Sequence, residues 1–227
     1  LEVRHGEIFG FIGPNGAGKT TMLKMITGIL KPDSGTILID NLDISKKPVT
    51  VKQKIGYVPD SHDVYDRLSG LEYLNFIADV YGLSKSERQS AMEKYLTMFS
   101  LRDAVNKRIK TYSHGMKQKL LVTAALLSNP PLWLLDEPLV GLDPRAAHLL
   151  KENMREHCAQ GNTVFFSTHV LEVAEKLCDR IAIIDKGRLV AVGSVQALKE
   201  KYESNAAGTS LESVFLSLTE FDEEGQG

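Results

Sequence analysis

The chain alternates short, continuous apolar runs with longer segments that have helical character. The apolar runs predict buried strands of the kind found in a parallel sheet covered on both faces. They occupy residues 7–12, 54–58, 131–135 and 162–166. Helices are expected between them, over residues 21–29, 117–128 and 144–160. This alternation predicts an α/β domain with a mostly parallel sheet.

Residues 63–110 differ in character from the segments on either side. Ser69-x-x-Glu72 and Ser84-x-x-Glu87 are capping boxes, and each predicts the start of a helix. Apolar residues then follow at helical spacing, and in the second helix they are Met92, Tyr95, Leu96 and Phe99. We predict a helical insertion in the α/β core, whose apolar stripe is buried packing rather than a ligand site.

Turn residues divide the remainder of the chain into short elements. Turns at 32–35 and 40–41 flank a predicted strand at 36–39, which indicates a small antiparallel sheet. A hairpin is expected at 180–192, and Ser194 begins a helix. Thr209-x-x-Glu212 is expected to cap a last amphipathic helix, before an acidic tail that we expect to be disordered. The predicted organisation is a core of residues 1–62 and 111–203, an insertion at 63–110 and a C-terminal segment at 204–227.

Composition narrows the class of protein without identifying it. Hydrophobic content of 43%, charged content of 25% and a net charge of −2 are ordinary for a globular chain, and they give no electrostatic reason to expect nucleic acid. Cys158 and Cys178 lack metal-ligand spacing, so reduced thiols are expected. No apolar run approaches the roughly 20 residues that span a bilayer. Because Leu1 lies just before a Gly-rich loop, we expect a fragment whose first strand is missing.

That Gly-rich loop, GPNGAGKT at residues 13–20, fits the phosphate-binding pattern G-x-x-x-x-G-K-[ST] between a predicted strand and a predicted helix. Glycines let the backbone turn its N–H groups inward, and the helix N-terminus adds partial positive charge. Lys19 would reach the β and γ phosphates, and the Thr20 hydroxyl would hold Mg²⁺. A Gly-rich turn that binds nothing is the weaker alternative. The predicted nucleotide-binding residues here are Gly13, Pro14, Asn15, Gly16, Ala17, Gly18, Lys19, Thr20 and Thr21.

Three further polar residues follow predicted strands, at the edge of the sheet where ligands of α/β folds bind. Asp136 and Glu137 come directly after the strand at 131–135. Asp136 is placed to hold the hydration shell of Mg²⁺, and Glu137 to orient or deprotonate an attacking water. His169 follows the strand at 162–166, and we predict that it contacts the γ-phosphate rather than serving a structural role.

The residues alone leave two positions open. Ser113 and Gly115 begin a predicted helix, so they form either a simple cap or a second anion site. Asp143 before Pro144 is a standard N-cap arrangement, which does not exclude a second role.

The ordered motifs GPNGAGKT, IGYVPD, YSHGMKQ, LLDEP, GLD and STH resemble the nucleotide-binding domain of an ABC ATPase over residues 6–193. The resemblance implies a P-loop NTPase fold with a RecA-like core and hydrolysis of ATP with Mg²⁺. It also implies a head-to-tail dimer, in which Ser113 and Gly115 contact the ATP of the partner and Asp143 signals between the two sites. Asp60 stands where the family usually has Gln, and it could reach Mg²⁺ or its water.

Other departures from the family pattern leave Lys19, Asp136 and Glu137 in place, so we predict a competent hydrolase. His114 and Met116 replace Gly and Gln in the signature, Val140 replaces a small residue, and the aromatic that stacks on adenine would lie upstream of Leu1.

Within the family, YSHGMKQ and SLESVFLSLTE are similar to the ATPase subunits of bacterial ABC-2-type exporters, including drug-efflux ATPases. This likeness implies a peripheral protein on the cytoplasmic face of the cell membrane. Its partners would be a second ATPase domain, identical or different, and multi-span permease subunits. A soluble ABC ATPase that acts on nucleic acid or ribosomes is the alternative, and the residues indicate neither the cargo nor the direction of transport.

Overall fold

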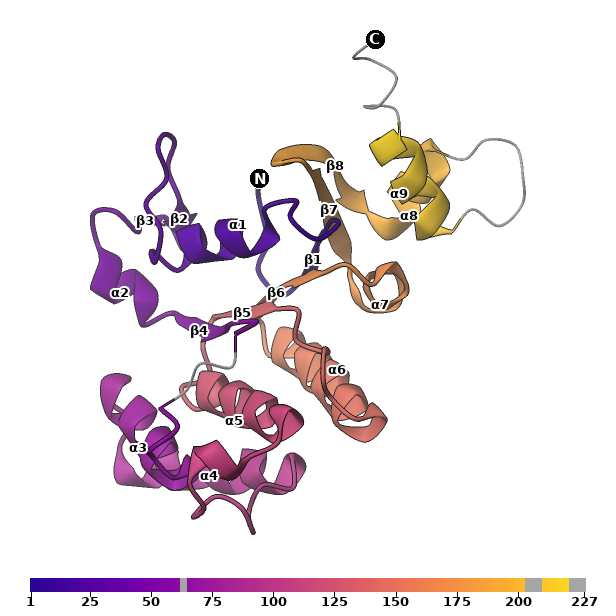
Figure 1. The fold of residues 1–227 in the computed structure, drawn as a ribbon. Helices are drawn as coiled ribbons and strands as arrows, with labels where there is room; N and C mark the ends of the chain where they lie inside the picture. The colour runs from indigo at the N-terminus through magenta and orange to yellow at the C-terminus, as the bar shows by residue number, and fades with distance from the viewer. Residues whose placement is uncertain (62–64, 203–209, 221–227) are drawn as a thin grey trace.

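A six-stranded sheet forms the centre of the molecule in the computed structural model, which describes residues 1–61, 65–202 and 210–220 (Figure 1). The strand order is β4-β5-β6-β1-β7-β8, and only β8 runs antiparallel to its neighbour. The bounds are β1 (Ile8–Ile12), β4 (Ile55–Val58), β5 (Leu132–Asp136), β6 (Thr163–Thr168), β7 (Arg180–Asp185) and β8 (Arg188–Ser194). The predicted α/β class with a mostly parallel sheet is confirmed.

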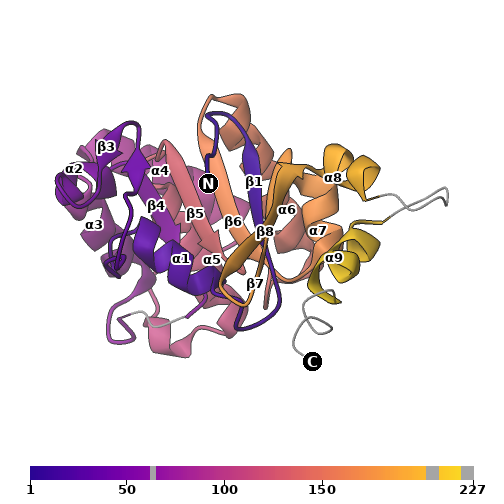
Figure 2. The same cartoon turned by 90° about the horizontal axis from the view of Figure 1, so that it is seen from above.

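Helices cover both faces of this sheet, which explains why its central strands are continuously apolar. Helix α1 (Lys19–Ile26) lies on one face, while α5 (His114–Leu126) and α6 (Pro144–Ala159) lie on the other (Figures 1 and 2). Every residue of β1 and of β6 is buried. Phe9 pairs with Phe165 across these two strands, and their rings stack with centroids 5.5 Å apart.

The predicted helical insertion leaves the sheet after β4 and returns before β5. It contains α3 (Gly70–Val80), α4 (Lys85–Met98) and the short 3-10 helix η1 (Ile109–Thr111), and it packs against α5 (Figure 1). Both capping boxes are formed, at Ser69 and Ser84. The α4 stripe is buried as predicted, with Met92, Tyr95, Leu96 and Phe99 each no more than 7% exposed.

Short elements differ more from the predictions. The two-stranded sheet of β2 (Leu38–Ile39) and β3 (Leu42–Asp43) is smaller than the predicted strand at 36–39. Helix α1 ends at Ile26 instead of residue 29, because Gly28 adopts a left-handed φ of 66°. Two of the described α-helices were not predicted at all, namely α2 (Pro48–Lys52) and α7 (Leu171–Leu177). Val51 is the one buried residue of α2, so this helix lacks the apolar stripe by which a helix is predicted from sequence.

The C-terminal part contains α8 (Val195–Lys201) and α9 (Leu211–Glu220), which pack on α7 and β8. Ser194 caps α8 as predicted. The predicted cap Thr209 and residues 221–227 of the predicted acidic tail lie outside the described residues. Next to α9, the Oγ of Ser210 accepts a hydrogen bond from the Ser213 amide at 3.3 Å. Among the described residues, no helix has the length and apolar character needed to cross a bilayer.

Candidate functional site

The Gly-rich loop joins β1 to α1 in a tight turn. Gly16 and Gly18 have φ of 83° and 107°, in the left-handed region that favours glycine. A side chain at Gly13 would place its Cβ 2.3 Å from the carbonyl oxygen of Ile184. Gly18 is the N-cap of α1 and supplies no side-chain hydrogen bond to it, so the first N–H groups of the helix are available to an anion.

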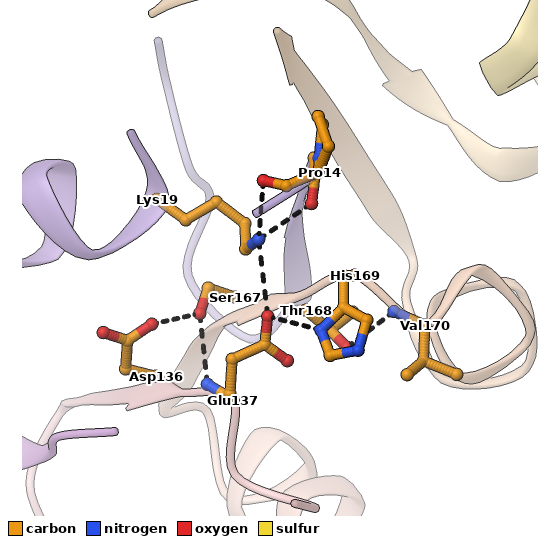
Figure 3. Close-up of polar contacts among 9 residues, drawn as sticks. Pro14, Lys19, Asp136, Glu137, Ser167, Thr168, His169 and Val170 are labelled. Carbon is orange, nitrogen blue, oxygen red and sulfur yellow. Dashed lines mark hydrogen bonds and ion pairs between the residues drawn. The ribbon is translucent and has the colours of Figure 1, made fainter. Parts of the chain in front are cut away.

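The ammonium group of Lys19 lies inside this loop. Its side chain is almost fully buried, and Nζ donates hydrogen bonds to the carbonyl oxygens of Gly13 at 2.8 Å and Pro14 at 3.2 Å (Figure 3). The same Nζ lies 3.4 Å from Oε1 of Glu137. The chain therefore brings the cation of the loop and the acidic end of β5 into direct contact.

Asp136 is the last residue of β5 and is fully buried. Its Oδ1 accepts a hydrogen bond from the hydroxyl of Ser167 at 2.5 Å, whereas its Oδ2 has no hydrogen-bond partner among the described residues. A buried carboxylate oxygen without a partner needs a cation or a water beside it. Carboxylate and hydroxyl oxygens are the ligands that Mg²⁺ prefers, so Asp136 and the half-buried Thr20 fit that ion.

Glu137 follows in an unusual backbone conformation, with φ of 46°. Its amide donates to Ser167 Oγ at 3.1 Å, and its Oε1 lies 2.9 Å from Nδ1 of His169 (Figure 3). One carboxylate oxygen therefore lies between Lys19 and His169. Non-glycine residues rarely adopt this φ, and such conformations gather at functional sites.

Ser167 is the first residue of the STH motif, but it is not among the predicted site residues. It lies on β6 directly beside Asp136 on β5, and its hydroxyl bridges the Asp136 carboxylate and the Glu137 amide. No local pattern could identify this role, because it depends on how two strands 31 positions apart are aligned.

Asp60 follows β4, the strand beside β5, and is exposed. Burial raises the pKa of the Tyr57 hydroxyl, and the negative charges of Asp136 and Asp60 raise it further. Strands β4 and β5 are parallel with Val58 beside Leu135, so Asp60 lies past the same carboxyl edge of the sheet at which Asp136 ends β5.

Ser113, Gly115 and Asp143 belong to a different part of the surface. Ser113 caps α5, with its Oγ accepting from the Met116 amide at 3.3 Å. Asp143 caps α6 by accepting from the Ala146 amide at 2.9 Å, and its ion pair with Lys119 lowers the pKa of its carboxyl group. Among the described residues, none of these three forms a hydrogen bond or an ion pair with Lys19 or Glu137. Both capping interpretations are therefore correct, and a second role needs a ligand from elsewhere.

Residues 1–140 match the family model described as "ABC transporter". The chain is similar to the ABC transporter ATP-binding protein NatA of Bacillus subtilis (strain 168), with 36% identity over 90% of this chain and 83% of that protein. It is also similar to the linearmycin resistance ATP-binding protein LnrL of the same organism, with 39% identity over 86% of this chain and 62% of LnrL. The chain thus spans only about three fifths of LnrL.

Two solved structures resemble the fold closely. One is the ATP-binding subunit of an ABC transporter, with a TM-score of 0.91 and 36% identity over 96% of this chain and 90% of the other. The second is a dimeric, post-hydrolysis state of the ATP-binding cassette MJ0796 bound to ADP and Pi. It matches with a TM-score of 0.78 and 27% identity, over 86% of this chain and 88% of the other.

Proposed function

Because the chain belongs to the ABC transporter family of ATP-hydrolysing proteins, we propose that it powers the export of a substrate through separate membrane subunits. The observation that carries the proposal is the meeting of Lys19 and His169 at one oxygen of Glu137, beside the buried carboxylate of Asp136. Phosphoryl transfer to water requires a cation, a base and a carboxylate that binds a metal ion beside a phosphate-binding loop. Lys19, Glu137 and Asp136 are these three groups.

The ATP phosphates bind to the backbone N–H groups of residues 15–18 and to the first turn of α1, including Thr21. Lys19 exchanges the carbonyl oxygens of Gly13 and Pro14 for the β and γ phosphates. Thr20 and Asp136 would hold Mg²⁺, with Asp60 available to its bound water, and the ion would supply positive charge beside the phosphates. The chain's own groups therefore fix the γ-phosphate before any bond changes.

Glu137 accepts a proton from a water molecule beside the γ-phosphate. The water oxygen forms a bond to phosphorus, the bond between phosphorus and the bridging oxygen breaks, and ADP and phosphate result. His169 lies 2.9 Å from Glu137 and contacts the γ-phosphate, so it helps to hold the base in line with the water. Lys19 stabilises the charge that develops on the phosphate oxygens.

A second ATPase chain, identical or different, completes each site. The N-terminus of α5, with Ser113 and Gly115, is an anion-binding surface that does not contact its own chain's Lys19. In a head-to-tail pair this surface would contact the γ-phosphate bound to the partner, and Asp143 would lie near the junction. The dimeric state of the similar ATP-binding cassette supports the pairing of two such chains.

Membrane permease subunits are the proposed partners at the helical insertion. Tyr65 and Phe76 are 62% and 45% exposed, and their rings meet edge to face at 5.9 Å. Val80 on α3 is also exposed. These residues form an apolar surface near the Asp60 loop that a membrane subunit could cover, while the ATPase itself lies on the cytoplasmic face. Leu68, close to Tyr65 along the chain, is half-buried.

Glu137→Gln tests the proposal, because it keeps the shape of the side chain and removes the base. Turnover should fall about 10²-fold or more, with ATP binding retained. Glu152→Gln on α6 is the matched control, since Glu152 is exposed and its carboxylate lies 3.7 Å from Nε2 of His148, away from the site. Steady-state phosphate release and equilibrium nucleotide binding are measured on both variants. Near-normal turnover in Glu137→Gln would refute the assigned role of the base.

A further inference from the structure

The loop that follows Glu137 contacts helix α5, whereas Glu137 itself is bonded to β6 through Ser167. Gln118 on α5 is 1% exposed, and its Nε2 donates a buried hydrogen bond to the carbonyl oxygen of Pro138 at 3.1 Å. Since a carbonyl oxygen can only accept, the amide nitrogen of Gln118 must face it. This contact fixes the residue directly after the proposed base.

Further along the loop, three more contacts join it to the first turns of α5. Lys119 Nζ lies 2.7 Å from Oδ2 of Asp143. Gly141 has φ of 77°, and a Cβ there would lie 2.2 Å from the ring of His114. A Cβ on Gly115 would lie 2.9 Å from the carbonyl oxygen of Gly141. The backbone from Pro138 to Asp143 therefore follows the N-terminal part of α5 at close range.

Glu137 itself needs such support, because its φ of 46° is costly for a residue with a side chain. Ser167 holds its amide from the β6 side, and Gln118 holds the next carbonyl group from the α5 side. The direction of the Glu137 carboxylate depends on both anchors, since a change in either alters the backbone dihedrals between them.

We propose that Gln118 is a positioning residue for the base Glu137. It also connects that base to Ser113, which begins the same helix and contacts the partner's ATP in the proposed dimer. The inference rests on the proposed function, because it needs Glu137 to act on water. The Oε1 of Gln118 is buried without a hydrogen-bond partner among the described residues, whereas buried polar atoms are ordinarily paired.

Gln118→Met tests the proposal, since it keeps the length of the side chain and removes the donor. The kcat should fall about tenfold or more, while the KM for ATP changes less than about twofold, because binding groups are untouched. Thr123→Val is the matched control on the same helix. Thr123 is fully buried and donates to the Lys119 carbonyl oxygen at 2.8 Å, but that bond stays within α5. The control should retain wild-type kcat.

The same two variants are then made in a Glu137→Gln background. If Gln118 acts through Glu137, Gln118→Met should not lower the residual turnover further, because the base it positions is already absent. An unchanged kcat in the wild-type background, or an equal loss in both backgrounds, would overturn the inference. If Glu137→Gln alone leaves turnover normal, the proposed function fails instead, which is a distinct outcome. Should Gln118→Met not fold, Gln118→Leu makes the same prediction.

Discussion

Ser167→Ala removes the hydroxyl that joins the two acidic residues at the end of β5. Ser167 is fully buried, donates to Asp136 Oδ1 at 2.5 Å and accepts from the Glu137 amide at 3.1 Å. Alanine supports neither bond. The change therefore leaves Oδ1 of Asp136 without a hydrogen bond, as Oδ2 already is, and it also leaves the Glu137 amide without one.

The expected loss follows from those two bonds. A hydrogen bond to a charged group contributes about 1.5–3 kcal/mol, and a neutral one about 1 kcal/mol. The free energy of unfolding should therefore fall by about 2–4 kcal/mol. For a domain of this size, that corresponds to a decrease in Tm of about 4–16 °C. The kcat should also fall about tenfold, because the Glu137 backbone loses an anchor.

Urea unfolding followed by circular dichroism gives the stability, and phosphate release gives kcat. Ser90→Ala is the control, because it is the same chemical change at an exposed position of α4. The control should be neutral or slightly stabilising, since alanine is the better helix former. If Ser167→Ala matches Ser90→Ala in both stability and kcat, the bridging role of Ser167 is refuted.

Two other predictions concern the loop near α5 and the dimer. Gly141→Ala should lower the free energy of unfolding by about 1–2 kcal/mol through left-handed backbone strain, and further through the clash of its Cβ with His114. The double variant His114→Ala/Gly141→Ala should regain only the part lost to the clash. Full recovery of stability in thermal melts would contradict the backbone strain. Ser113→Asp should keep the α5 cap, since Asp is a good N-cap, but should abolish turnover by placing a negative charge against phosphate. If identical chains pair head to tail, an equal mixture of inactive Ser113→Asp and Lys19→Ala chains should regain about a quarter of the wild-type rate. Half of the dimers are then mixed, and each mixed dimer has one intact site of its two. A mixture as inactive as its components would contradict the shared site.

Signals contained within a few consecutive residues predicted the structure well. The capping boxes at Ser69 and Ser84, the N-cap at Asp143 and the Gly-rich turn before Lys19 all form as expected. Each depends on side chains that bond to backbone three residues away, or on a backbone that only glycine adopts easily. Such local chemistry leaves the same pattern in any fold.

Contacts between distant segments could not be predicted in the same way. The bridge from Ser167 to Asp136 depends on the alignment of β5 with β6, and the Gln118 bond to Pro138 depends on how α5 packs beneath the sheet edge. The left-handed conformation of Glu137 also follows from these surroundings rather than from its own preference. The candidate residues could therefore be named from the sequence, whereas the groups that position them required the structure.

The most direct test of the central claim is affinity purification of the protein from detergent-solubilised membranes, with partners identified by mass spectrometry. The account predicts recovery of a multi-span membrane protein, and reduced recovery with Tyr65→Ser, which makes the exposed apolar surface of the helical insertion polar. Recovery of only soluble proteins, ribosomes or nucleic acid would contradict the transport function and leave the ATPase chemistry to be explained by another role.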